Sequence, residues 1–450
     1  MNKKQAILAS TILLIAPQVF LGQAQPAPEL RAGAAKVDIT PGEKELPRNY
    51  EGILDHIYSR AIVVDNGATR AALISVDAGA VGDAMWKQVT ERLQADLRIP
   101  ASNVVINATH THSVGFGGNP ALVDKIVQSV KLAADRLTPA RIGYGTGLSY
   151  LNVQRDYIDP KTRKWWEGAN YDGLSDKTVA VVKFEKPDGQ PIAVYYNYAM
   201  HAVITGQLDL ISGDAPGAAS RYIEDSYDDK IVALWSTGAC GDQNPIYFQQ
   251  TFDLREIRIA DYKKRGEDIS NSMPPGGQGL NKKDPQVIRL MNQQKQMILS
   301  MGQFLGEEVM HAMRSMEHLD SAAPIYGAQK TITCPGRERL DRGRGGAEGS
   351  YKEGKPVDIR LGMLMIDGIA FGAVNGEVYN LIAQRLKRES PYSRTMMVTL
   401  ANGSASSGYI PDDASFGHYT FEVLSSRLQP GCAESAIVNG LIELMPPPKY

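Results

Sequence analysis

The stretch Asn103-Val-Val-Ile-Asn-Ala-Thr-His-Thr-His-Ser113 carries the first decisive signal in this sequence. Its apolar, β-branched residues predict a strand, and the strand runs directly into two histidines, His110 and His112. Residues i and i+2 share a face while the chain stays extended, so both imidazoles can point into one cleft at the strand end. Such a pair alone is more often a surface or core feature than a metal site, because zinc needs three or four protein ligands. The pair therefore needs partners from elsewhere in the chain.

Four more apolar, strand-like segments each lead into a residue that can do chemistry. In α/β proteins, ligands and catalytic groups gather at the carboxyl ends of strands, so we expect one composite site. Taken singly, each residue has a structural alternative: Glu377 could cap a helix, Tyr409 could be a turn aromatic, and Asp242 could be an Asx-turn residue. The segments are residues 192–200 leading to His201, 231–235 leading to Asp242, 369–376 leading to Glu377, and 395–400 leading to Tyr409.

The alternation of strand-like and helix-like segments predicts an α/β fold. Hairpin-type turns at Lys186-Pro-Asp-Gly-Gln190 and Ile366-Asp-Gly-Ile369 indicate antiparallel neighbours, so we expect mixed β-sheets layered with covering helices. No Pro/Ser-rich linker divides the chain, which favours one large catalytic domain over residues 25–450. Strands are expected at residues 61–64 and 71–76, and helices at residues 83–97, 122–137 and 286–318.

Five motifs follow one another along the chain. They are Thr-His-Thr-His-Ser at 109–113, Asn-Tyr-Ala-Met-His at 197–201, Ser-Gly-Asp-Ala-Pro-Gly at 212–217, Gly-Asp-Gln-Asn-Pro at 241–245 and Asn-Gly-Glu at 375–377. In this order they resemble the neutral ceramidase family, and the combination is far more specific than any one motif. The resemblance runs from about Gly33 to near Glu422.

The resemblance implies a metal centre within layered sheets covered by helices. By this resemblance, His112 and Arg155 lie near the metal for substrate contact. The implied zinc ligands are His110, His201, Glu377 and Tyr409.

Three departures from the family pattern bear on the substrate. Ceramide-cleaving members have Gly-Asp-x-Ser-Pro where this chain has Asn244, so an amide replaces a hydroxyl that could serve as a nucleophile. The family's Tyr before Glu appears here as Phe421, which removes a possible hydrogen-bond donor. We also expect no carboxyl-terminal β-sandwich domain after the catalytic one. These departures weaken the expectation of ceramide specificity more than that of zinc chemistry.

The residues permit metal-assisted hydrolysis. A Zn²⁺ ion held by two His, one Glu and one Tyr lowers the pKa of bound water from about 15.7 to about 7 and polarises a carbonyl, so no serine is required. We expect His112 or Asp242 to be the general base, and Arg155 to stabilise an oxyanion or an anionic substrate group. Tyr409 has a second possible role, since a phenol that leaves the metal can donate a hydrogen bond to the oxyanion.

The predicted function is that of a secreted zinc hydrolase acting on the amide bond of a ceramide-like N-acyl lipid. Two alternatives stay open: a zinc hydrolase of an N-acyl sugar, another glycan or an ester, and a non-catalytic member that binds a lipid or glycan. An intact ligand set favours catalysis, because a binding module has no need for an open metal coordination position.

The amino terminus predicts a periplasmic or secreted location. A basic start at Met1-Asn-Lys-Lys, a mostly apolar stretch over residues 6–21 and small residues at 22–24 are typical of a signal peptide over residues 1–24. No other stretch approaches the roughly 20 apolar residues that cross a bilayer, so we expect no transmembrane segment.

The charge content limits the classes of binding partner, and the cysteine content limits the possible disulfides. With 48 basic and 50 acidic side chains, no overall field attracts nucleic acid, which favours a small-molecule or lipid substrate. The chain has three cysteines; in an oxidising compartment Cys334 and Cys432 can pair, with Cys240 buried beside the Gly-Asp turn.

Overall fold

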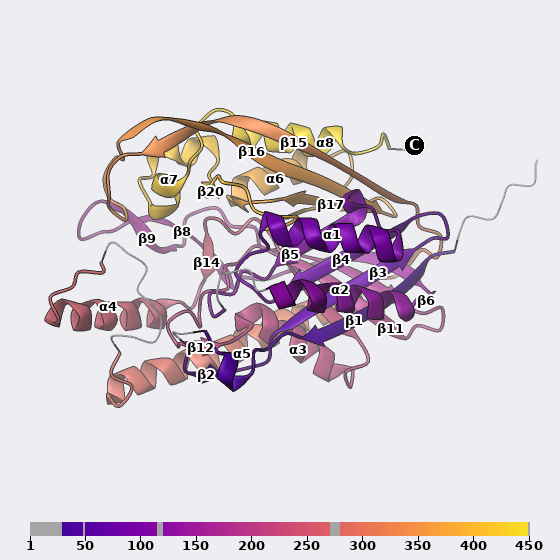
Figure 1. Ribbon diagram of the computed structural model, residues 1–450, viewed down its shortest axis with the longest axis horizontal. Coiled ribbons are helices and arrows are strands. Elements are labelled where there is room, and N and C mark those ends of the chain that lie inside the picture. The colour runs from indigo at the N-terminus through magenta and orange to yellow at the C-terminus, as the bar shows by residue number, and fades with distance from the viewer. Residues whose placement is uncertain (1–28, 48–49, 115–119, 271–279, 449–450) are drawn as a thin grey trace, which may run out of the picture.

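The computed structural model describes residues 29–47, 50–114, 120–270 and 280–448 (Figure 1). The expected signal peptide at residues 1–24 lies outside these ranges. Within them, no helix combines the length and the apolar character that crossing a membrane requires.

The first large sheet brings the His-x-His segment to a strand end. Its strand order is β5-β4-β3-β1-β6, and β4 and β5 run parallel with α1 as the connection between them. Helices α1 and α2 cover its outer face in Figure 1. The elements are β1 (Arg31–Asp38), β3 (Tyr58–Asp65), β4 (Arg70–Val76), α1 (Asp83–Leu97), β5 (Val104–Ala108), α2 (Pro120–Asp135) and β6 (Thr138–Pro139).

The second sheet has the order β13-β11-β10-β7. Strands β10 and β11 form the expected hairpin around residues 186–190, whereas β11 and β13 are parallel and joined through α3. Helices α3 and α5 pack on its outer face. The elements are β7 (Arg141–Leu148), β10 (Thr178–Glu185), β11 (Pro191–Tyr198), α3 (Asp214–Ser226), β13 (Val232–Thr237), α4 (Gln249–Lys264) and α5 (Pro285–Arg314).

The third sheet contains a long antiparallel ribbon, β15–β16, that arches over the top of the molecule in Figure 1. Its order is β15-β16-β17-β19, with β17 parallel to β19, and a Cys334–Cys432 disulfide ties β15 to the start of α8 as expected. Cys240 is free and buried. The elements are β15 (Ile325–Arg339), β16 (Tyr351–Ile366), β17 (Ile369–Val374), α6 (Asn380–Glu389), β19 (Thr395–Val398) and α8 (Ala433–Glu443).

Short elements fill the space between the sheet ends. Strands β14, β8 and β9 form a small antiparallel sheet, and two parallel pairs join β2 to β12 and β18 to β20. These elements are β2 (Gly52–Ile53), β8 (Asn152–Ile158), β9 (Trp165–Asn170), β12 (Leu210–Ile211), β14 (Gln243–Pro245), β18 (Glu377–Val378), β20 (Tyr409–Ile410), α7 (Phe421–Ser425), and 3₁₀ turns at Glu43–Glu45, Ala101–Asn103 and Asp413–Gly417.

The three large sheets share one apolar core. Leu73, Tyr195 and Phe371, one from each sheet, are fully buried in it, while the opposite sheet faces pack against helices. This confirms the expected α/β architecture of mixed sheets covered by helices. The helix expected to reach His318 instead ends at Arg314, because Asp320 pairs with Ile142 of β7 and draws the chain out of the helix.

Candidate metal centre

His110 lies where the chain turns out of β5. Its backbone has a positive φ of 63°, a conformation that non-glycine residues rarely adopt and that is concentrated at functional sites. The backbone N–H of His110 donates to the carbonyl of Ala78 at 3.0 Å, and its Nδ1 lies 2.7 Å from the carbonyl oxygen of Gly79. A ring whose Nδ1–H donates to a carbonyl presents the lone pair of Nε2 on its other side.

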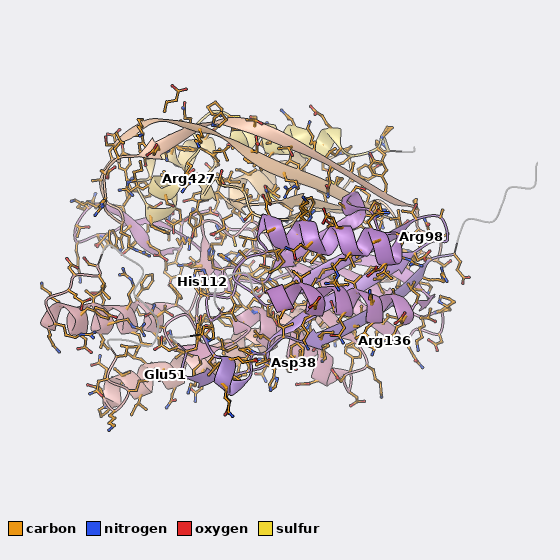
Figure 2. The ribbon with its side chains drawn as sticks, viewed as in Figure 1. Asp38, Glu51, Arg98, His112, Arg136 and Arg427 are labelled. Atoms are coloured by element: carbon orange, nitrogen blue, oxygen red, sulfur yellow. A yellow bond between two sulfur atoms is a disulfide. The ribbon has the colours of Figure 1, made fainter. Side chains whose placement is uncertain are left out.

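His201 is held in the same way at the end of β11. Its Nδ1 lies 2.7 Å from the carbonyl oxygen of Cys240, and its Nε2 lies 3.2 Å from Nε2 of His110. Nε2 of His112 is 3.4 Å from the same atom of His110. The ligand nitrogens of these three histidines all lie within 4.8 Å of one another, so the group can bind a metal ion. Figure 2 labels His112 toward the middle of the view.

Glu377 adds an oxygen donor to the histidines. It begins β18, directly after the third sheet, and its Oε2 lies 3.5 Å from Nε2 of His110 and 3.4 Å from Nε2 of His201. This oxygen is buried and has no hydrogen-bond donor among the described residues. A buried acceptor facing imidazole lone pairs is unfavourable until a cation joins them. The nitrogen and oxygen donors therefore fit a divalent metal such as zinc.

The pKa values of the residues in this cluster are shifted in different directions. Burial lowers the pKa of His110, but the Glu377 carboxylate outweighs this and raises it above its ordinary value. Burial and the neighbouring imidazoles hold the pKa of His112 well below its ordinary value, and burial together with Arg155 lowers that of His201 to about 4. Burial raises the pKa of Glu377, yet His110 and His201 keep it well below the usual range. At neutral pH the cluster therefore holds a carboxylate and at least two neutral imidazoles.

Tyr409 lies beside Glu377 because β20 pairs in register with β18. Its ring is stacked at 6.5 Å from that of His201, and the guanidinium carbon of Arg155 lies 5.3 Å from its centroid. A cavity of about 220 Å³ is lined by Tyr409, Glu377 and His110, together with small residues such as Ala80. The donors therefore border a space that can admit a small group.

Arg155 is brought close to the cluster by β8, but its own donors are largely engaged. Nη2 donates to the carbonyl of Gly241 at 2.6 Å, Nη1 donates to Oδ1 of Asn244 at 3.2 Å, and Nε lies 3.0 Å from Oε1 of Glu422. Burial raises the pKa of Glu422 to about 7, against the effect of the Arg155 charge. The guanidinium is thus fixed in place beside Tyr409.

Asp242 lies in the turn after β13, where its carboxylate supports the backbone. Oδ1 accepts from the N–H of Asn380 at the start of α6 at 2.8 Å, and Oδ2 accepts from Nε2 of Gln154 at 3.1 Å. Burial raises the pKa of Asp242 to about 8, with the charge of Asp156 adding to the effect. A Cβ at Gly241 would come within 2.9 Å of the Val378 carbonyl, which explains why this turn begins with glycine.

Sequence reasoning missed the acidic partners of Arg155. Glu422 was noted only as the neighbour of Phe421, and nothing in the pattern around Glu167 marked it. Oε1 of Glu167 lies 4.0 Å from Nη1 of Arg155 and accepts from Nδ2 of Asn244 at 3.2 Å. A buried arginine in a strand is the available signal, since such a charge needs carboxylate partners.

Comparisons with known proteins find similarity to neutral ceramidases over much of the chain. A family model described as neutral/alkaline non-lysosomal ceramidase, N-terminal, matches residues 35–336. Neutral ceramidase of Pseudomonas aeruginosa is 28% identical over 305 residues, which cover 58% of this chain and 45% of that protein. Neutral ceramidase of Drosophila melanogaster is 26% identical over 279 residues, covering 54% and 39%. The chain thus spans less than half the length of these curated relatives.

Solved structures show the same fold. One described as ceramidase complexed with C2 matches 92% of this chain and 74% of its own chain, with a TM-score of 0.67 at 17% sequence identity. The crystal structure of neutral ceramidase from Pseudomonas aeruginosa matches the same shares with a TM-score of 0.65 at 17% identity.

Proposed function

Because this chain belongs to the neutral/alkaline non-lysosomal ceramidase family, we propose that it is a zinc-dependent amidohydrolase that cleaves the amide bond of an N-acyl lipid. The observation that carries the proposal is the buried Oε2 of Glu377, which lacks a hydrogen-bond donor among the described residues while facing His110 and His201. In this proposal the residues that hold zinc are His110, His201, Glu377 and Tyr409.

When bound, zinc supplies a water of lowered pKa and polarises the scissile carbonyl. We assign the general base to His112, because its Nε2 lies 3.4 Å from that of His110, beside the residues that would hold zinc. Asp242 is less suited to that role, since both of its oxygens accept hydrogen bonds from Asn380 and Gln154. Arg155 lies against the ring of Tyr409, and a Tyr409 hydroxyl that leaves the metal would donate a hydrogen bond to the oxyanion.

The substrate class follows from the relatives, which are neutral ceramidases by name. A different amide, such as that of an N-acyl sugar, or an ester is the second candidate. It is favoured by Asn244, whose amide engages Arg155 and Glu167 where ceramide-cleaving members are expected to have a serine. The basic, then apolar start of the chain supports a periplasmic or secreted location.

The test uses the full chain after export, loaded with zinc and freed of excess metal. We expect about one zinc per chain and release of fatty acid from ceramides of several acyl lengths. His110→Ala should lose both. His311→Ala should lose neither, because this histidine lies on α5 with 68% of its side chain exposed.

Three outcomes separate the candidates. Zinc without ceramide turnover moves the search to other amides and esters, and keeps the metal hydrolase. Absence of zinc from the wild-type chain overturns the proposal. Turnover retained by His110→Ala does the same.

A further inference from the structure

Asn244 uses both ends of its amide inside the protein. Oδ1 accepts from Nη1 of Arg155 at 3.2 Å, and Nδ2 donates to Oε1 of Glu167 at 3.2 Å. The side chain is buried, with 2% of its surface exposed. An amide suits this position because it offers an acceptor to the cation and a donor to the carboxylate. Serine is shorter, and an aspartate would place a second negative charge against Glu167.

Glu167 has a further partner on a distant part of the chain. Its Oε2 accepts from Nη2 of Arg344 at 2.8 Å, across 177 positions in sequence. Arg344 belongs to the hairpin tip, defined here as residues 340–350 between β15 and β16. In Figure 1 this end of the ribbon bends toward β8 and β9. A continuous series of polar contacts therefore links the hairpin tip to Arg155.

The hairpin tip also contacts the segment around α7. The guanidinium carbon of Arg344 lies 4.7 Å from the ring centroid of Phe421, and the Phe421 ring meets the Tyr409 ring edge-on at 5.9 Å. The N–H of Gly346 donates to the carbonyl of Tyr419 at 2.9 Å. Arg344 thus reaches Tyr409 by two routes, through the Phe421 ring and through Glu167, Asn244 and Arg155.

The charges around Arg155 explain why its position should depend on Arg344. Arg155 is buried between the carboxylates of Glu422 and Glu167, at 3.0 and 4.0 Å. Arg344 lies 2.8 Å from Glu167 and Arg155 lies 4.0 Å from it, so removal of Arg344 should let Glu167 draw Arg155 toward itself and away from Tyr409. A shift of about 1 Å at a reacting group is enough to cost about 100-fold in rate.

We propose that Asn244 and Glu167 are positioning residues that connect Arg344 to Arg155, so that Arg155 faces Tyr409 correctly only when the hairpin tip is seated on β9. This inference deepens the proposed function, because the contact between Arg155 and Tyr409 belongs to the proposed site. It also explains the asparagine at position 244: the residue holds an arginine in place.

The kinetic test compares Arg344→Ala with Arg342→Ala. Both remove one positive charge from the hairpin tip, and Arg342 is exposed. We expect Arg344→Ala to lower kcat about 10- to 100-fold with little change in KM or zinc content, as is typical for residues that orient a metal site from outside its ligands. Arg342→Ala should match wild type, and Arg344→Lys should recover most of the lost kcat by restoring the ion pair with Glu167.

A double-mutant cycle tests the connection itself. If Arg344 acts through Asn244, the double variant Arg344→Ala/Asn244→Ala should be no slower than Asn244→Ala alone. Multiplicative losses would mean that Arg344 acts through Phe421 and not through Asn244, which would overturn the proposal, as would equal kcat values for Arg344→Ala and Arg342→Ala.

A second readout does not depend on turnover. The Nε–H NMR signal of Arg155, assigned by its loss in Arg155→Lys, should shift in Arg344→Ala and in Asn244→Ala but not in Arg342→Ala. An unmoved signal overturns the inference even if the enzyme is active. A shifted signal in a chain that cleaves no amide supports the inference and contradicts only the proposed function.

Discussion

Two buried clusters of charged side chains differ in whether their polar atoms are satisfied. In the first, Nε of Arg60 donates to Glu224 at 2.9 Å, Nη1 of Arg60 donates to Asp77 at 3.1 Å, and Nζ of Lys36 donates to Glu224 at 2.8 Å. In the metal centre, by contrast, Oε2 of Glu377 has no hydrogen-bond donor among the described residues.

The difference separates a structural role from a ligand-binding role. The Arg60 cluster joins β1, β3 and α3 and matches each carboxylate with cations of its own chain. The candidate metal centre instead places the Glu377 carboxylate 3.5 Å from the imidazole of His110 and 3.4 Å from that of His201, and only His110 has a raised pKa. Burial of an acceptor without a hydrogen bond is unfavourable, so the geometry of this cluster fits an external ion.

The largest expected effect is on zinc binding and turnover, when one ligand is removed from the His110–His201–Glu377 cluster. His201→Ala should abolish zinc binding and reduce turnover to background, because the remaining donors no longer surround the ion. The stability of the zinc-free chain should change little, since metal binding is what this cluster contributes. Zinc content by atomic emission and urea unfolding of the zinc-free protein measure the two effects. Full zinc occupancy in this variant would mean that His201 is not a ligand, and the proposed difference in role between the two clusters would be wrong.

The next largest effect is on the free energy of unfolding, when the Arg60–Glu224 ion pair is broken. Glu224→Ala leaves Arg60 buried with only Asp77 as a close carboxylate, and breaking a buried pair typically costs about 3–5 kcal/mol. We expect the free energy of unfolding to fall by this amount, measured by urea titration at pH 7. Activity and zinc content per folded molecule should stay at wild-type values. A parallel loss of zinc would show that the two clusters are coupled.

The site was predictable where it depends on strand ends. His110, His201, Glu377 and Tyr409 each follow an apolar run, and parallel strand pairs bring the carboxyl ends of those runs to one region. The strand-end rule predicts that these residues lie together with Asp242, whereas their selection as a ligand set comes from the resemblance to the neutral ceramidase family. The helix at residues 83–97 was likewise predictable from its pattern and coincides with α1.

The supporting contacts were not predictable from sequence. The contact between Glu167 and Arg344 depends on how a long ribbon bends back on β9, and residue spacing does not encode that path. Arg155 was expected to contact the substrate, yet its donors engage Gly241, Asn244 and Glu422. Strand patterns give residue positions along the chain, whereas such partners come from the packing of separate sheets.

Removal of the metal should lower the thermal stability of every variant that keeps the His110–His201–Glu377 cluster. Zinc that binds only the folded chain stabilises it by about 2.7 kcal/mol when its free concentration is 100 times Kd. A chelator should therefore lower the Tm of wild type and of Glu224→Ala, but leave that of His201→Ala unchanged. Differential scanning calorimetry with and without chelator checks this. A chelator-dependent shift in His201→Ala would point to a metal elsewhere in the chain.

The smallest expected effect is a pH dependence of the free energy of unfolding that arises from Glu224 in the Arg60 cluster. Burial raises the pKa of Glu224, but Arg60 and Lys36 outweigh this and hold it below its ordinary value. A carboxyl group with a depressed pKa in the folded state stabilises the fold above its unfolded pKa of about 4.3, and this contribution is lost as pH falls through the folded pKa. Asp77 works in the opposite direction, because burial raises its pKa and outweighs the lowering effects of Arg60, the Tyr58 N–H and Arg221.

Glu224→Gln isolates the contribution of Glu224 from that of Asp77. In wild type the free energy of unfolding should fall between pH 5 and pH 3.5 more steeply than in Glu224→Gln, where no proton can be taken up at this position. Urea titrations of zinc-free protein at several pH values measure the slope and keep metal release out of the comparison. Equal slopes would mean that Glu224 takes up its proton alike in both states, and that the cation pairing in this cluster adds no net stability to the folded chain.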